Sequence, residues 1–126
     1  MAIATVNPAT GETLRTFDAL GDQGIEEKLQ RSVEAARVNR KRSFEDRSAR
    51  MRKTADLLDQ RQKEYGRLMT VEMGKPIKVA IAEANKCALV CRYYADHAKE
   101  FLADEPVKTE AEKTFIRYEP IGPVLA

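Results

Sequence analysis

The most reactive side chains of this sequence, Cys87, Cys91 and His97, fall within one short stretch. The two cysteines are four positions apart, a spacing that places them on one face of a helix. Two such thiols could ligate a soft metal ion, but the chain has only one His and no third Cys to complete the shell. A disulfide along a helix face is geometrically poor. We therefore expect two small buried residues, the usual environment of free cysteines.

His97 does not form a nucleophile pair with either cysteine. It follows Cys91 by six positions and Cys87 by ten, whereas neighbours on a helix are three or four apart. We expect His97 to pair or cap at the surface. A phosphate-binding loop is not indicated either, because Gly21-Asp22-Gln23-Gly24 lacks a third glycine and a preceding buried strand. Residue types and spacing alone give no catalytic constellation.

One segment is strongly basic, with Glu45 and Asp46 as its only acids, and comprises Arg37, Arg40, Lys41, Arg42, Arg47, Arg50, Arg52 and Lys53. It could bind phosphate or a protein partner, but we favour the solvated face of amphipathic helices. The formal net charge of the whole chain is only +2, and Phe44 is the one aromatic residue in the segment. Both features argue against nucleic acid as a partner.

The 126 residues have the composition of a globular domain, with 43% hydrophobic and 33% charged residues. No apolar run approaches the roughly 18 residues of a membrane span, and the N-terminus lacks the charged and apolar regions of a leader. We therefore expect a cytoplasmic protein with no membrane association. One His and two Cys nearly exclude a zinc site and a disulfide framework.

Residues 1–20 predict a β-hairpin, because two strand-like runs, 3–6 and 13–17, flank the turn residues 7–11. From there the apolar period lengthens to about 3.6, which indicates an amphipathic helix over 22–41 with Asp22 as its cap. Ser43 and Asp46 have capping-box spacing and start a second helix. We expect this helix to run without a break to Gly74-Lys75-Pro76, along the stripe Met51, Ala55, Leu58, Tyr65 and Met69.

A third helix ends at Pro106 and has the clearest periodicity, with one face formed by Ile77, Ala80, Ile81, Ala84, Cys87, Ala88, Cys91, Tyr94, Ala98 and Phe101. Residues 114–118 then predict an exposed, pairing strand. The apolar end Val124-Leu125-Ala126 resembles the opening of a buried parallel strand that is cut off before its turn. We expect a truncated chain.

Four motifs together carry a family resemblance: 5–12 (TVNPATGE), 72–76 (EMGKP), 92–95 (RYYA) and 118–124 (YEPIGPV). Their order and spacing resemble the N-terminal quarter of the aldehyde dehydrogenase superfamily. Segments 71–76 and 101–105 are most similar to its succinate-semialdehyde dehydrogenase branch. The resemblance covers essentially the whole chain.

The resemblance implies an α/β fold of which this chain is an N-terminal piece: a β-hairpin, three long helices, an arm strand and the start of a buried parallel strand. Its divisions would be a hairpin and helical part over 1–105, an oligomerisation arm over 106–119, and the beginning of the doubly wound dinucleotide-binding core over 120–126. The arm implies a homodimer or homotetramer when the enzyme is complete.

The activity implied is oxidation of a small-molecule aldehyde by NAD or NADP, and the branch of the family implies succinate semialdehyde, oxidised to succinate, as the substrate. In the family a Cys thiolate attacks the aldehyde, the thiohemiacetal gives a hydride to the nicotinamide, and a Glu-activated water releases the acid. The family motifs for these steps, and for the dinucleotide, follow the part that this sequence matches. No catalytic or cofactor-binding residue is therefore assigned here, neither cysteine takes the nucleophile's role, and we expect this chain to be inactive without the remainder of the enzyme.

Two lesser sites are implied by the resemblance. The third helix lines the family's aldehyde tunnel, which points to Lys86, Val90 and Cys91 as wall residues. A monovalent cation, Na⁺ or K⁺, would use positions Thr5, Val6 and Glu72, whose oxygen ligands suit hard ions. The alternative for Glu72 is an ordinary surface acid at a helix end.

Two other functions remain open at this point. The first is an aldehyde dehydrogenase for another substrate, such as betaine aldehyde or a medium-chain aldehyde. The second is a free-standing, non-enzymatic helical module that binds an acidic partner through its basic face.

Overall fold

The computed structural model describes residues 3–125, which begin with an antiparallel hairpin. Strand β1 (Ile3–Val6) pairs with strand β2 (Thr13–Phe17). Their turn is closed by backbone hydrogen bonds from the Gly11 amide to the Asn7 carbonyl (2.8 Å) and from the Asn7 amide to the Glu12 carbonyl (2.9 Å). Gly11 has a φ of 73°, which a residue without a Cβ adopts easily. The predicted hairpin is confirmed.

Four helices follow within the described residues, where three were expected: α1 (Asp22–Arg40), α2 (Phe44–Gln60), α3 (Gln62–Met73) and α4 (Ile77–Phe101). The prediction of an unbroken second helix was wrong, because the chain leaves helical geometry at Arg61, with φ −108° and ψ 16°. Neither Gly nor Pro marks that position. The bend gives α3 its own direction, in which Gly66 lies directly against Ile81 of α4.

The helix ends follow the sequence in part. Ser43 caps α2 as predicted, since its Oγ accepts a hydrogen bond from the Asp46 amide at 3.1 Å. Gly74 ends α3 in the left-handed conformation, with a φ of 72°. Asp22 is not a cap: Gly21 takes that position without a side-chain hydrogen bond, and Asp22 begins the helix. There its charge faces the positive end of the helix dipole.

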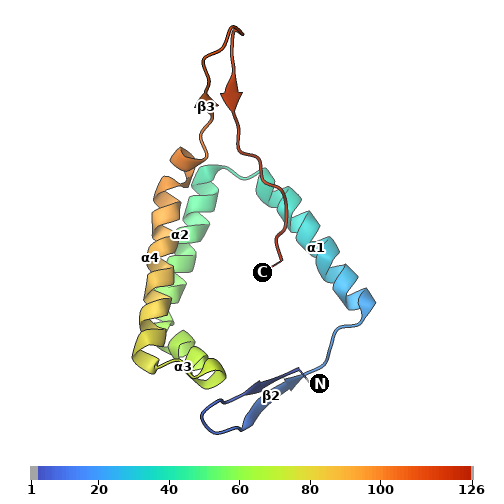
Figure 1. Ribbon diagram of the computed structural model, residues 1–126, viewed down its shortest axis with the longest axis vertical. Helices are drawn as coiled ribbons and strands as arrows, with labels where there is room; N and C mark the ends of the chain where they lie inside the picture. Colours follow the sequence, from blue (N-terminus) through green and yellow to red (C-terminus); the bar gives the residue numbers. More distant parts are fainter. Residues whose placement is uncertain (1–2, 126) are drawn as a thin grey trace.

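Helices α2 and α4 lie side by side and antiparallel, and α3 packs on the first half of α4 (Figure 1). The buried apolar residues of the described part are all alanines at these contacts: Ala55, Ala80, Ala84, Ala88 and Ala95. The predicted period of α4 is therefore confirmed, although its larger apolar residues Tyr94 and Phe101 are about half exposed. Helix α1 stands apart from this pair and buries no residue.

The C-terminal part differs from the prediction in three ways. Helix α4 ends at Phe101, well before Pro106, which instead lies in strand β3 (Glu105–Pro106). β3 pairs antiparallel with β4 (Phe115–Ile116), so the expected strand 114–118 is shorter and finds its partner within the chain. Residues 120–125 form no strand, and Ala126 lies outside the described residues. A strand there needs neighbouring strands on both sides, and residues 3–125 provide none.

No helix among the described residues has the length and apolar character needed to cross a membrane.

Candidate functional site

The hairpin lies against the end of α3, and this contact brings the predicted cation residues onto neighbouring elements (Figure 1). β1 carries Thr5 and Val6, and the ring of Pro8 faces Gly74, where an added Cβ would lie 3.2 Å from the proline Cγ. The ladder changes register between Thr5 and Val6. Such an irregularity disturbs the strand pairing at the two positions predicted to supply carbonyl ligands.

Glu72 is exposed near the C-terminal end of α3, and no ion-pair partner for it is found within residues 3–125. The same residues hold no group of three or more His, Cys, Asp or Glu side chains that could bind a metal ion. A divalent site with several carboxylates is thus not formed in this part of the chain. One carboxylate with backbone carbonyls is a donor set that suits a singly charged hard cation.

The predicted tunnel residues occupy two sides of α4. Lys86 and Val90 are one turn apart on an exposed face, where Val90 is 44% accessible. Cys91 leaves the helix about 100° further round and is only partly exposed. The structure therefore brings Lys86 and Val90 together and places Cys91 beside the packed seam.

The expectation that both cysteines are buried was wrong. Cys87 is exposed, Cys91 is intermediate, and both are free thiols. The buried positions of α4 belong to the alanines that face α2 and α3, whereas Cys87 lies on an exposed flank. The period of the helix could be predicted from the sequence, but how far other residues pack over each side of the helix could not.

His97 lies at the surface, as expected. Its Nδ1 is 3.9 Å from a carboxylate oxygen of Glu100, and its ring centroid is 4.6 Å from that of Tyr93 and 6.0 Å from that of Phe101. These neighbours are two aromatic rings and a carboxylate, and neither cysteine is among them. His97 therefore has the environment of a surface aromatic cluster rather than that of a catalytic base.

A row of polar contacts joins α2 and α4 along their seam, and we call it the polar ladder. It was not predicted from the sequence. Near one end Lys99 Nζ contacts Glu45 at 3.0 Å, and further along Arg52 contacts Asp96 at 2.5 Å. Between them the Ser48 hydroxyl donates to the carbonyl oxygen of Ala95 at 2.6 Å. The available signal was the alternation of charge at helical spacing in both segments.

Arg92 continues this ladder with two partners. Its Nη2 lies 2.7 Å from Asp59 Oδ2 and 2.9 Å from Asp56 Oδ1. The hydrogen bonds that Arg92 donates to Asp59 and Asp56 raise the pKa of its guanidinium above its already high usual value. The arginine of the RYYA motif is thus a connection between helices, whose charge persists at any physiological pH.

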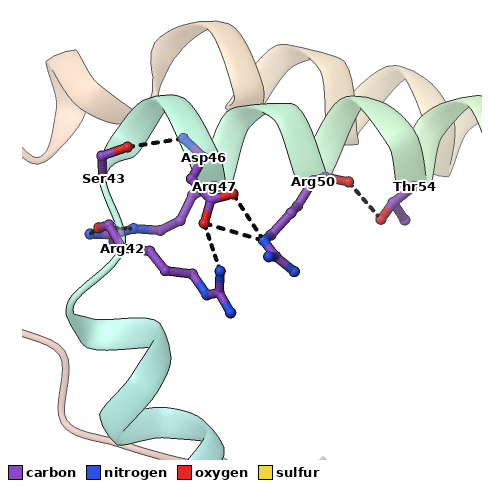
Figure 2. A network of polar contacts seen from close by, with 6 residues as sticks. All are labelled: Arg42, Ser43, Asp46, Arg47, Arg50 and Thr54. Carbon is purple, nitrogen blue, oxygen red and sulfur yellow. Dashed lines mark hydrogen bonds and ion pairs between the residues drawn. The ribbon is translucent and has the colours of Figure 1, made fainter.

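The basic segment is largely paired at the start of α2. Figure 2 shows the Asp46 carboxylate between Arg42 and Arg50, at 2.8 and 3.3 Å. These arginines hold the pKa of Asp46 below its usual value, chiefly through the hydrogen bond from Arg42. Arg47 donates to the Arg42 carbonyl at 2.9 Å and lies over the Phe44 ring. This geometry agrees with the favoured interpretation of a solvated helical face.

Two grooves of the described part lie next to arginines of the basic segment. One of about 390 Å³ lies between α1 and residues 120–123, and another of about 340 Å³ lies between α2 and α4. Arginines line both, but neither lining contains a carboxylate, a thiol or an imidazole. Neither groove therefore offers a carboxylate or imidazole base or a thiol nucleophile.

Comparison with known proteins places the chain in a family. The sequence profile described as "Aldehyde dehydrogenase family" matches residues 1–126. A Synechocystis sp. protein with the name "Probable succinate-semialdehyde dehydrogenase", NADP⁺ type, is 53% identical over 126 residues. The succinate-semialdehyde dehydrogenase (NADP⁺) of Mycobacterium avium is 45% identical over 130 residues. Each alignment covers 100% of this chain but 28% of the relative, so the chain spans little more than a quarter of their length.

A solved structure gives the same result in three dimensions. The succinic semialdehyde dehydrogenase of Streptococcus pyogenes, determined in complex with NADP⁺ as the cofactor, superposes with a TM-score of 0.83 and 36% identity. The match covers 90% of this chain and 25% of that one.

Proposed function

Because the chain belongs to the aldehyde dehydrogenase family along its whole length, we propose that it serves as the N-terminal segment of an NADP⁺-dependent enzyme that oxidises succinate semialdehyde to succinate. The named activities of the relatives support the substrate and the cofactor. The resemblance in motifs 5–12, 72–76, 92–95 and 118–124 points to the same branch.

The observation that carries the proposal is the exposed surface of the chain. Its accessible area is 10670 Å², whereas a compact monomer of this mass exposes roughly 6,800 Å². The excess is several times the roughly 800 Å² that each partner covers in a standard protein–protein interface. Large apolar side chains contribute to it, including Leu89, Ile121 and Leu125. A segment built into a larger fold has this property, and a free-standing helical module does not.

Within such an enzyme this segment shapes the site rather than performing the reaction. We assign Lys86, Val90 and Cys91 to the wall of the aldehyde path, and the exposed positions of Lys86 and Val90 on α4 support the assignment. The Lys86 ammonium would attract the carboxylate of succinate semialdehyde. NADP⁺, when bound, accepts the hydride from the substrate, and no residue of this chain is assigned to its binding.

We also propose a monovalent cation site at the contact between the hairpin and α3. The Glu72 carboxylate and the carbonyl oxygens of Thr5 and Val6 would bind Na⁺ or K⁺, and the irregular strand pairing at these positions and the single acid support this choice. Replacing choline chloride by NaCl or KCl at equal ionic strength should raise the melting temperature of the assembled enzyme. Glu72→Gln should abolish that rise, whereas a rise that persists in the variant would rule out the site.

The β3–β4 hairpin is our candidate for the contact with another subunit. Each of its strands uses one edge for the other, so an outer edge remains for pairing with a further strand. Light scattering of the assembled enzyme with and without residues 107–113 would test this. A complete enzyme that keeps its dimeric or tetrameric mass after the deletion contradicts the assignment.

A chimera tests the proposed function directly. The corresponding N-terminal 28% of the Synechocystis relative is replaced by residues 1–126, and NADPH formation is followed at 340 nm with succinate semialdehyde, betaine aldehyde and a medium-chain aldehyde. We expect activity that is highest with succinate semialdehyde. The relative without its N-terminal segment, and the 126-residue chain alone, serve as controls and should be inactive. A folded chimera that prefers another aldehyde would transfer the proposal to that substrate.

A further inference from the structure

We propose that Arg92 is a positioning residue, whose contacts with Asp56 and Asp59 fix the rotation of α4 about its own axis and thereby the placement of Lys86 and Val90. The inference rests on the proposed function in one respect, because that function assigns the two wall residues to the aldehyde path. The contacts themselves are independent of that assignment.

The buried side chains between α2 and α4 do little by themselves to define this rotation. The buried apolar residues of the described chain are alanines, four of them on α4. Helices normally interlock because large side chains of one enter grooves of the other. A methyl group is a shallow ridge, so an alanine seam permits close approach with little resistance to turning or sliding. Ile81 packs on Gly66 of α3 near the start of α4, and further along the helix directional polar contacts with α2 add the restraint that alanines do not give.

Arg92 is the seam residue best placed to supply it. Among the cross-helix ion pairs of residues 3–125, Lys99 and Arg52 each contact one carboxylate, whereas Arg92 contacts two. Asp56 and Asp59 are three positions apart, so they lie side by side on α2. Because Nη2 of Arg92 lies against both carboxylates, a shift of α4 in either direction lengthens one of the two contacts, whereas Lys99 and Arg52 are each held by a single carboxylate.

Of the wall residues, Val90 lies on the side of the helix opposite this restraint. Val90 and Arg92 leave α4 about 200° apart, since successive residues turn about 100°. A helix with side chains is about 10–12 Å across, so a rotation of about 20° moves a side-chain end by roughly 2 Å. A misfit of this size resembles the change of one methylene in a hydrophobic pocket, which alters substrate discrimination by about tenfold or more.

The experiment compares Arg92→Met with Arg92→Lys, Asp56→Asn/Asp59→Asn and the matched control Arg52→Met in the active chimera. We expect Arg92→Met to raise KM for the aldehyde about tenfold, with kcat and KM for NADP⁺ changed less than about twofold. The double Asn variant should reproduce this effect, and Arg92→Lys should restore most of it. Arg52→Met removes one contact of the same ladder and should lower the melting temperature without a change in KM.

The proposal is overturned if Arg92→Met and Arg52→Met lower stability alike with KM unchanged, or if kcat and both KM values worsen together. Should Arg92→Met not fold, the single Asn variants keep the side-chain volume and decide the question. The alkylation rate of Cys91 by iodoacetamide gives a readout without activity. We expect at least a threefold change in the Asn variants and none in Arg52→Met. If the chimera does not oxidise succinate semialdehyde, the proposed function is refuted. The alkylation rates of Cys91 in the variants then still decide whether Arg92 positions α4.

Discussion

Helices α3 and α4 approach closely at Gly66, and a single methyl group is too large for the space. A Cβ built on it would lie 2.6 Å from Cγ1 of Ile81 and 3.1 Å from the Ile81 backbone nitrogen. Overpacking of this kind costs about 1–3 kcal/mol. We therefore expect Gly66→Ala to lower the free energy of unfolding of the chimera by that amount, as measured by urea denaturation.

Gly24 provides the matched control, because it also lies inside a helix but has room for a methyl group. An added Cβ there would be 3.4 Å from Leu20 Cδ2, an ordinary contact. Ala is preferred to Gly in helices by about 0.5–1 kcal/mol, so Gly24→Ala should stabilise. Equal effects of the two substitutions would show that helix propensity, rather than the contact with Ile81, determines the result.

At the scale of residues, the sequence predicted which helix or strand carries a residue better than it predicted the contacts and burial of its side chain. Thr5, Val6 and Glu72 were grouped through the family resemblance, and the structure places β1 against α3. The two partners of Arg92 could not be predicted, since they depend on the register of α2 against α4. Cys87 was expected to be buried because it belongs to the apolar face of the helix. The helical period shows on which face a residue lies, but it does not show whether other residues pack over that face.

At the scale of elements, the β3–β4 hairpin depends on an ion pair at its base. Arg117 Nε and Nη2 donate to the two Asp104 oxygens at 2.9 and 2.6 Å. The hydrogen bonds from Arg117 hold the pKa of Asp104 below its usual value. A lowered pKa in the folded state means that the stabilisation is complete above the ordinary Asp pKa of about 3.9 and is lost as the pH falls through the folded pKa.

We therefore expect amide exchange in residues 105–118 to be steady near neutral pH and to accelerate, relative to the intrinsic rate, below about pH 4. Asp104→Asn should remove this acid-dependent step while leaving the exchange at neutral pH faster than in the parent chain. Glu110→Gln, at the far end of the hairpin, is the control and should keep the step. Mass spectrometry of peptides from the hairpin provides the measurement.

The elements themselves were largely predictable, because apolar period and cap residues act locally. Helix α1 and the Ser43 cap of α2 follow the prediction closely. The break at Arg61 has no local signal, since Gln60 and Gln62 are good helix formers. Its reason is tertiary: the bend lets α3 bring Gly66 to α4. Residues 120–125 likewise form no strand, because a buried strand is defined by its neighbours.

At the scale of the whole molecule, the exposed apolar surface governs the behaviour of the isolated chain. The core of the described part is five alanines, while residues such as Leu29 and Leu89 are more than half exposed. So small a core gives little cooperativity. We expect the purified 126-residue chain to melt over a broad range by circular dichroism, to bind a hydrophobic dye, and to produce no NADPH from NADP⁺ and succinate semialdehyde.

The alternative of a free-standing helical module predicts the opposite behaviour of the isolated chain. It requires a soluble monomer with one sharp transition, and salt-sensitive binding to an acidic partner through the arginines near the start of α2. The pairing of Arg42 and Arg50 with Asp46 leaves less charge for such a partner. Ultracentrifugation and calorimetry of the same sample separate the two cases, and a cooperative monomer would count against the enzyme segment.

The alanine seam also limits how this molecule can change over evolutionary time. A site such as Ala80 or Ala88, with no exposed surface, admits glycine or serine but not a larger neighbour in the genetic code such as valine. Drift at these sites should therefore be confined to small residues. The charged pairs along the same seam can exchange sign together, as Arg52 with Asp96 would. The charged residues of the seam can therefore diversify while its buried alanines stay small.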